Sequence, residues 1–122
     1  MPKAKTTVLV VEDSTLIRMG MAGLALAAGF EVLEASDADE AIRLLEDRSD
    51  IDLVFTDVGM PGAMDGVALS HHIRDRWPPV KLIVASGQTV IDESHLPEGA
   101  RFFLKPYDGD VVIDAIATMV AD

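Results

Sequence analysis

The chain alternates five times between a short apolar run and a segment with helical periodicity, and this alternation limits the available folds more than any other feature of the sequence. Three strongly apolar runs cover residues 7–11, 53–55 and 80–85. Nearly continuous apolar runs are typical of strands buried on both faces of a parallel sheet. Two weaker runs, at residues 31–35 and 101–104, are predicted to be edge strands.

Segments with a helical spacing of apolar residues separate and follow these runs. Helices are predicted over residues 14–28, 37–48, 65–76 and 111–120. The first three begin at a serine or an aspartate, whose side chain can accept hydrogen bonds from the N–H groups of the first turn. The segment 89–96 is short and polar, and proline follows it directly. The fourth helix in chain order is therefore predicted to be short or degenerate.

Five successive strand–helix units predict an α/β fold with a doubly wound parallel sheet. Parallel strands are joined by right-handed crossovers, which place helices on both faces of the sheet. The length of 122 residues suits one domain. We therefore expect residues 1–122 to form a single domain with no output domain.

The balance of charges excludes several classes of partner. The chain has 10 basic and 21 acidic residues, which gives a net charge of −11. A surface this negative repels the backbone of nucleic acids and an anionic membrane. The chain has no cysteine, which excludes disulfides, thiolate zinc sites and a cysteine nucleophile. No targeting segment or membrane span is recognised, so a cytoplasmic protein without a nucleic-acid or membrane partner is expected.

Polar residues stand where four of the predicted strands end. Glu12 and Asp13 follow the first strand, Asp57 follows the third, Ser86 ends the fourth and Lys105 follows the fifth. In an open parallel sheet, ligands bind outside the carboxyl ends of the strands. Each of these residues alone suits a helix cap, a turn or a solvated charge. Together they predict three carboxylates, a hydroxyl and an ammonium at one edge of the sheet.

Such a cluster is suited to holding a phosphoryl group. Three close carboxylates repel one another, and a divalent cation with oxygen ligands, above all Mg²⁺, removes that repulsion. Mg²⁺ keeps coordination positions open for phosphate oxygens, and Lys105 and Ser86 can contact the remaining oxygens. A carboxylate can attack phosphorus to give an acyl phosphate. Asp57, between the acid pair and the Ser86–Lys105 side, is the predicted nucleophile.

Four segments carry a resemblance to a known family. Residues 8–13, 56–66, 84–87 and 102–106 resemble, in this order, the acid-pair strand, the phosphoacceptor loop, the switch strand and the lysine loop of bacterial response-regulator receiver domains. The resemblance covers nearly the whole chain and is closest to stand-alone, chemotaxis-receiver-like members. It implies a flavodoxin-like (βα)5 fold with a five-stranded parallel sheet of order 2-1-3-4-5.

The resemblance also implies a role for each acidic position. Asp57 would accept a phosphoryl group from a sensor histidine kinase or a histidine phosphotransfer protein. Asp13 and Asp57 would bind Mg²⁺, or Mn²⁺ in its place, together with the carbonyl of Gly59. Glu12 would act on the metal through water.

The remaining positions are implied to sense the phosphoryl group. Lys105 would pair with a phosphoryl oxygen, and the bond between Lys105 and Pro106 would be cis. Ser86 would swing toward the phosphoryl group while Phe102 rotates inward. Serine stands where threonine is frequent in the family, and Phe102 stands where tyrosine is frequent, so this position offers no hydroxyl to a partner.

The leading interpretation is a phosphoacceptor switch that acts on an unknown downstream protein by contact, with no enzymatic activity beyond its own phosphorylation and dephosphorylation. A phosphate sink that only drains a kinase is an alternative. A Mg²⁺-dependent phosphatase with an aspartyl nucleophile is less favoured, because such enzymes need a second aspartate where Gly59 stands. A flavin-binding domain of the same architecture is disfavoured because Glu12 and Asp13 would repel the flavin phosphate.

The first predicted helix is unusually apolar. Its core-facing residues are predicted to be large: Leu16, Ile17, Leu24 and Met21. Its solvent-facing residues are then also apolar or small: Met19, Ala22, Gly23 and Leu26. These residues are either apolar or small side chains scattered singly over the surface, or a patch that contacts a partner. A patch of Met19, Ala22 and Leu26 would suit a kinase phosphotransfer helix or a second copy of the domain in a homodimer.

Overall fold

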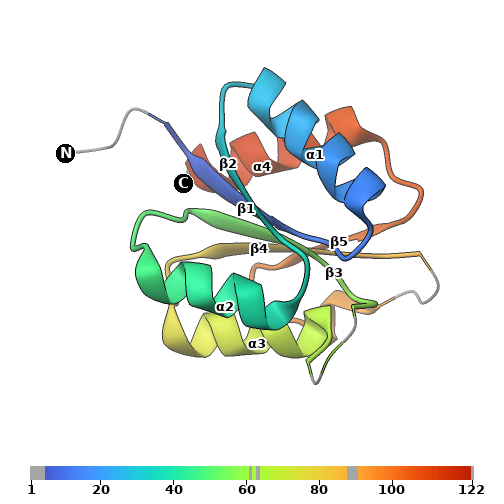
Figure 1. The fold of residues 1–122 in the computed structure, drawn as a ribbon. Coiled ribbons are helices and arrows are strands. Elements are labelled where there is room, and N and C mark those ends of the chain that lie inside the picture. The colour runs from blue at the N-terminus through green and yellow to red at the C-terminus, as the bar shows by residue number, and fades with distance from the viewer. Residues whose placement is uncertain (1–4, 61, 63, 88–90, 122) are drawn as a thin grey trace.

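A computed structural model describes residues 5–60, 62, 64–87 and 91–121. Its five strands are all parallel and lie in the order β2-β1-β3-β4-β5, as predicted (Figure 1). The elements, in chain order, are β1 (Thr7–Val11), α1 (Thr15–Ala27), β2 (Glu31–Ala35), α2 (Ala38–Asp47), β3 (Leu53–Asp57), α3 (Gly66–Arg76), β4 (Lys81–Ser86), the 3₁₀-helix η1 (Glu93–His95), β5 (Arg101–Leu104) and α4 (Gly109–Ala121).

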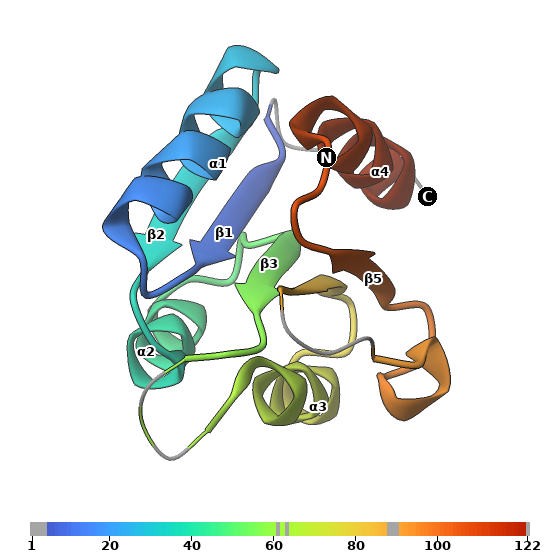
Figure 2. The ribbon, with the colours of Figure 1, turned by 90° about the vertical axis from the view of Figure 1, so that its right-hand side faces the viewer.

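Helices cover both faces of the sheet. In Figures 1 and 2, α1 and α4 lie on one side of the strands and α2 and α3 lie on the other. Alternate residues of each inner strand belong to different core clusters, since Val8 and Val10 pack with α1 and α4 whereas Leu9 and Val11 pack with α2 and α3. Both faces of the inner strands are therefore buried, which is why their sequences are continuously apolar.

The starts of the first three helices are fixed by side-chain caps. Ser14, Asp37 and Asp65 each accept a hydrogen bond from a backbone N–H in the first turn of the helix that they precede. The loop after α1 contains Gly29, whose φ of 96° lies in the region that favours glycine. The predicted boundaries of these helices agree with the structure to within one or two residues.

The orientation of α1 differs from the prediction. Leu16, Ile17 and Leu24, expected in the core, are exposed, with Leu16 at 83%. Ala22, expected on the surface, is 4% exposed and packs inward. The buried stripe consists of Met21, Ala22 and Ala25.

The physical reason for this orientation lies in the first two turns of α1. Arg18 is on the same side of the helix as the buried stripe, since residues 18, 21, 22 and 25 are three or four apart. Its guanidinium is bound at the end of β1 and to β2, which fixes that side toward the sheet. Met19 and Leu26 are exposed as predicted.

The connection between β4 and β5 contains only one helical turn in its described part. η1 spans three residues, and Thr89 and Val90 of the expected segment lie outside the described residues. Two α3 side chains bind this connection: His71 Nε2 lies 2.8 Å from the His95 carbonyl oxygen, and Arg74 Nη1 donates to the Glu98 carbonyl at 2.6 Å. The prediction of a short or degenerate fourth helix is confirmed for the residues that the structure describes.

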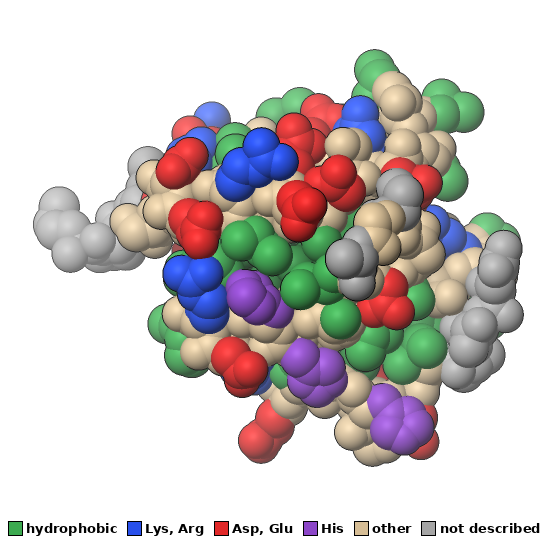
Figure 3. All heavy atoms as spheres, turned by 60° about the horizontal axis from the view of Figure 1, so that its bottom comes forward, with side chains coloured by type: hydrophobic (Ala, Val, Ile, Leu, Met, Phe, Trp, Pro, Cys, Tyr) green, Lys and Arg blue, Asp and Glu red, His purple; other side chains and the backbone are tan. Residues whose placement is uncertain are grey.

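Acidic and basic side chains are interspersed over the face formed by α2 and α3 (Figure 3). Ion pairs join Arg48 to Asp50 at 2.6 Å and Arg76 to Glu46 at 3.0 Å. In contrast, Arg18 is the only charged residue of α1. Within the described ranges, every helix is too short or too polar to cross a bilayer.

Candidate phosphoryl-transfer site

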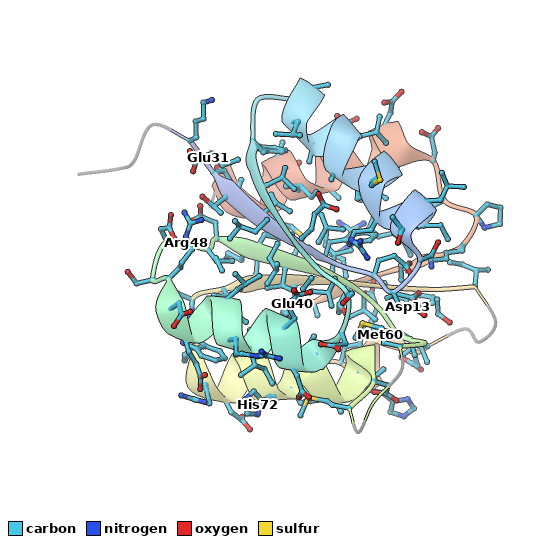
Figure 4. All side chains as sticks on the ribbon, viewed as in Figure 1. Asp13, Glu31, Glu40, Arg48, Met60 and His72 are labelled. Atoms are coloured by element: carbon cyan, nitrogen blue, oxygen red, sulfur yellow. The ribbon has the colours of Figure 1, made fainter. Side chains whose placement is uncertain are left out.

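The carboxyl ends of four strands bring the predicted site residues together. The strands are parallel and in register, with Val11 opposite Thr56, Asp57 opposite Ala85 and Ser86 opposite Leu104. Residues that follow or end these strands therefore lie at one edge of the sheet, which Figure 2 turns toward the viewer. Figure 4 shows Asp13 and Met60 at this end of the molecule, whereas Glu31 and Arg48 lie at the other end.

Lys105 joins two of the carboxylates. Its Nζ lies 2.8 Å from Glu12 Oε1 and 2.9 Å from Asp57 Oδ1. Burial alone would lower the pKa of Lys105, but its hydrogen bonds to Glu12 and Asp57 outweigh burial and raise the pKa above its ordinary value. The ammonium therefore stays charged beside the predicted nucleophile at neutral pH.

Glu12 is the buried member of the acid pair, with 2% exposure. Burial raises its pKa, and hydrogen bonds from Lys105 and from the Ser14 N–H offset part of this rise. The Ser14 N–H donates to Glu12 Oε2 at 3.0 Å while Glu12 Oε1 faces Lys105. Both carboxylate oxygens are thus held, so Glu12 fixes the position of the lysine.

The acidic residues fit a hard divalent cation. Ligand atoms of Glu12, Asp13 and Asp57 all lie within 4.8 Å of one another, and Asp13 is exposed, so the cluster is open to solvent. The three carboxylates and one ammonium leave two negative charges, which a divalent cation would neutralise. Gly59 lies close to the cluster, because a Cβ placed on it would be 3.8 Å from Asp57 Oδ2. Oxygen ligands in this number suit Mg²⁺ with several waters.

Ser86 and Phe102 lie on the β4–β5 side of the site. Ser86 is buried, and its carbonyl accepts a hydrogen bond from the Lys105 N–H at 2.8 Å. Phe102 lies opposite Val84 in β5, and its half-buried side chain packs on the core beneath α2 and α3. Its N–H donates to Glu93 Oε2 at 2.9 Å. The bond between Lys105 and Pro106 is cis, as the resemblance implies.

An apolar cavity of about 430 Å³ lies beside Lys105. It is lined by Ile17 from α1, Gly87 after β4, and the segment Lys105, Pro106 and Tyr107. The Tyr107 ring packs edge-on against Phe55 with the centroids 5.7 Å apart, and burial raises the pKa of its hydroxyl. The cavity thus connects the site to the exposed apolar face of α1.

The sequence interpretation missed two residues that support the site. Arg18 donates from Nη1 to the Glu12 carbonyl at 2.8 Å. Gly66 packs on the backbone of Asp57, where a Cβ would overlap the Asp57 carbonyl group. Arg18 could have been singled out from the sequence, because it is a lone charged residue one turn into an apolar helix. The contact of Gly66 depends on the path of the loop after β3, for which the sequence carries no signal.

Comparison with known proteins agrees with this arrangement. The sequence profile of the response regulator receiver domain matches residues 8–117. The chemotaxis protein CheY of Bacillus subtilis is 32% identical over 113 residues, which cover 89% of this chain and 92% of CheY. The sensor kinase CckA of Brucella abortus is 36% identical over 102 residues, which cover 82% of this chain.

The chain spans only a part of several of these relatives. It spans 11% of the sensor kinase CckA and 25% of the hydrogenase transcriptional regulatory protein HoxA of Cupriavidus necator. Among solved structures, a response regulator receiver domain protein from Clostridium thermocellum superposes with a TM-score of 0.86 at 28% identity, over 95% of this chain and 94% of that chain. The profile match, the strand order and the relatives together show that this chain belongs to the response regulator receiver domain family.

Proposed function

We propose that this protein is a phosphoacceptor switch in which Asp57 takes a phosphoryl group from the phosphohistidine of a sensor histidine kinase or a histidine phosphotransfer protein. One observation carries the proposal: Asp57 Oδ1 lies 2.9 Å from Lys105 Nζ within the cluster that also contains Glu12 and Asp13. Glu12 contacts the same ammonium, but both of its carboxylate oxygens are already bound, Oε1 by Lys105 and Oε2 by the Ser14 N–H.

The transfer would proceed by attack of an Asp57 carboxylate oxygen on phosphorus. An O–P bond forms and the N–P bond to the donor imidazole breaks. The imidazole leaves as the neutral base, with one proton on a ring nitrogen that was either present before transfer or taken up from solvent as the bond breaks. A bound Mg²⁺ would neutralise charge on the phosphoryl oxygens and on the carboxylates. Glu12, Asp13 and Asp57 would hold that ion.

Lys105 would contact the phosphoryl group once the acyl phosphate has formed. Its contact with Asp57 would be exchanged for a contact with a phosphoryl oxygen, while its contact with Glu12 keeps the ammonium in place. The Ser86 hydroxyl would donate to another phosphoryl oxygen. We propose that Ser86 and Phe102 then change position together, so that the surface around β5 differs between the two states.

The output of this switch is proposed to be a protein contact in the cytoplasm. On this proposal the chain is not an enzyme acting on a separate substrate, since its chemistry is confined to its own phosphorylation and dephosphorylation. A phosphate sink uses the same site chemistry and differs only in having no downstream target. Binding of partners to the phosphorylated form, compared with an Asp57→Asn variant, distinguishes the two.

The phosphodonor is proposed to dock on α1. The exposed large apolar residues of this helix are Leu16, Ile17, Met19, Leu24 and Leu26. Ile17 also lines the cavity next to Lys105, so a helix seated on this face would be adjacent to Asp57. Ala22 is not part of this surface because it is buried.

Phosphorylation tests the proposal directly. Incubation with Mg²⁺ and acetyl phosphate should add one phosphoryl group, measured by intact mass, and Asp57→Asn should abolish the addition. Asp39→Asn, which changes an exposed carboxylate in the first turn of α2, should be labelled like the wild type. Labelling of Asp57→Asn would show that another residue is the acceptor.

A further inference from the structure

Arg18 is bound to the backbone of the acid pair and to a carboxylate of β2. Its guanidinium donates from Nη1 to the Glu12 carbonyl oxygen at 2.8 Å and from Nε to Glu34 Oε1 at 3.1 Å. The side chain is 17% exposed, against 38% and 49% for the paired arginines 48 and 76. Neither contact is with a carboxylate of the site, so the hydrogen bond of Arg18 at the site is made to the backbone that carries those carboxylates.

The contact lies at a point where the sheet no longer holds the chain. The pairing of β1 ends at Val11 on both sides, opposite Ala35 and Thr56. The Glu12 N–H still donates to the Ala35 carbonyl at 3.0 Å, but the Glu12 carbonyl lies beyond the ladder and is bound by Arg18. This carbonyl belongs to the peptide group that joins Glu12 to Asp13.

Because a peptide group is planar, fixing its carbonyl fixes the plane from which the next residue departs. Holding the Glu12 carbonyl therefore fixes the position of the Asp13 Cα, and with it the region that the exposed Asp13 carboxylate can reach. Glu12 itself is held by Lys105 and by the Ser14 N–H. The hydrogen bond from Arg18 therefore helps to fix the position of the exposed Asp13 relative to the buried Glu12.

Glu34 gives the guanidinium its orientation. This residue lies in β2 opposite Val10 of β1, and its carboxylate accepts from Nε while Nη1 faces the Glu12 carbonyl. The two donors belong to one rigid planar group, so the carboxylate on one side aligns the hydrogen bond on the other. A lysine offers a single nitrogen to both acceptors and lacks the rigid planar group that aligns one contact with the other.

We infer that Arg18 is a positioning residue that sets the affinity of the acid cluster for a divalent cation by holding the peptide between Glu12 and Asp13. The inference rests on the proposed function in so far as that function requires the cation. Loss of groups that orient metal ligands typically lowers metal affinity by about 10- to 100-fold. A loss in this range is expected when Arg18 is removed.

Metal binding measured without phosphorylation tests this role. The dissociation constant for Mn²⁺ would be measured by electron paramagnetic resonance, with Mg²⁺ as competitor, on the wild type and on Arg18→Met and Arg18→Lys. Arg18→Met should raise the dissociation constant at least about tenfold, and Arg18→Lys should lie between the two. Glu34→Gln should also raise it, by less than Arg18→Met, since the donor remains but loses its alignment.

Arg76→Met is the matched control. It breaks an arginine–glutamate pair of 3.0 Å, similar to the 3.1 Å pair of Arg18, at the end of α3 that precedes β4. It should leave the dissociation constant unchanged. An equal loss in Arg76→Met, or a wild-type constant in Arg18→Met, would overturn the inference.

Two further outcomes separate this inference from the proposed function. If Arg18→Met does not fold, judged by circular dichroism, wild-type metal affinity in both Arg18→Lys and Glu34→Gln overturns the positioning role. If the wild type binds Mn²⁺ and Arg18→Met does not, but Asp57→Asn is still phosphorylated, the positioning role stands and the assignment of the acceptor is wrong.

Discussion

Lys105 contacts two carboxylates at once, and this places a positive charge next to the nucleophile before any phosphoryl group arrives. The contact with Lys105 orients the proposed nucleophile Asp57, and the second contact, with Glu12, holds the lysine in the site. Asp13 is the exposed member of the cluster and is not one of the two carboxylates that Lys105 contacts. At the scale of single residues, the metal is therefore expected to depend most on Asp13.

Replacing Asp13 with asparagine tests that dependence. The change removes one charge from a group of three, so affinity for Mg²⁺ should fall at least tenfold, about 1.4 kcal/mol. Labelling by acetyl phosphate should slow in parallel. The metal-free protein should be as stable as the wild type or more stable, because one repulsion is lost. Asp13→Asn phosphorylated at the wild-type rate in limiting Mg²⁺ would remove Asp13 from the ligands.

At the scale of elements, α1 serves the site in two ways. Its inward side carries Arg18 and the small residues that pack on the sheet, and its outward side is apolar and uncharged. An exposed apolar helix face is typical of a contact surface rather than of solvated structure. Ile17 of this face lines the cavity beside Lys105, where the proposed phosphotransfer helix would approach.

Charge added to this face should impair phosphotransfer from a kinase but not labelling by acetyl phosphate. Met19→Glu with Leu26→Glu should lower phosphotransfer from a cognate kinase at least tenfold, about 1.4 kcal/mol. Both side chains are exposed, so the fold and the labelling by acetyl phosphate should be unchanged. Ala68→Glu, at an exposed position of α3 on the other face of the sheet, should affect neither donor. Equal loss with both donors would contradict docking on α1.

The orientation of α1 shows where sequence reasoning stops at this scale. Strands and caps were predictable because their signals are local: a β-branched run, or a serine or aspartate before a helix. In α1 nearly every residue is apolar, so the periodicity does not say which side is buried. The hydrogen bonds of Arg18 to the end of β1 and to β2 determine which side is buried. They depend on residues outside the helix, which the periodicity of α1 does not include.

The site itself was predictable because the topology does most of the positioning. Once four parallel strands end at one edge, Glu12, Asp13, Asp57 and Lys105 must converge. The contact of Gly66 with the Asp57 backbone was not predictable, because it depends on how the loop after β3 returns to the sheet.

At the scale of the whole molecule, the net charge of −11 makes stability sensitive to ions of any kind. Binding of Mg²⁺ at a specific site of the folded protein raises the free energy of unfolding further, by mass action. Mg²⁺ at a hundredfold excess over its dissociation constant should stabilise the fold by about 2.7 kcal/mol, measured by thermal unfolding. NaCl at matched ionic strength should give a smaller increase, and a tenfold weaker site in Asp13→Asn should reduce the contribution of Mg²⁺ to about 1.4 kcal/mol. Equal shifts with both salts would mean that screening alone acts.

Among the described residues, the sheet separates two cores that share no side chain, since alternate strand residues pack with α1 and α4 or with α2 and α3. The proposed donor surface is on the first side, whereas the Phe102 side chain and the tether of η1 to α3 are on the second. Substitutions that alter packing on one side leave the other core's composition intact. If the donor surface and the response are divided in this way, as proposed, descendants of such a domain could exchange one phosphodonor for another without changing the residues that respond.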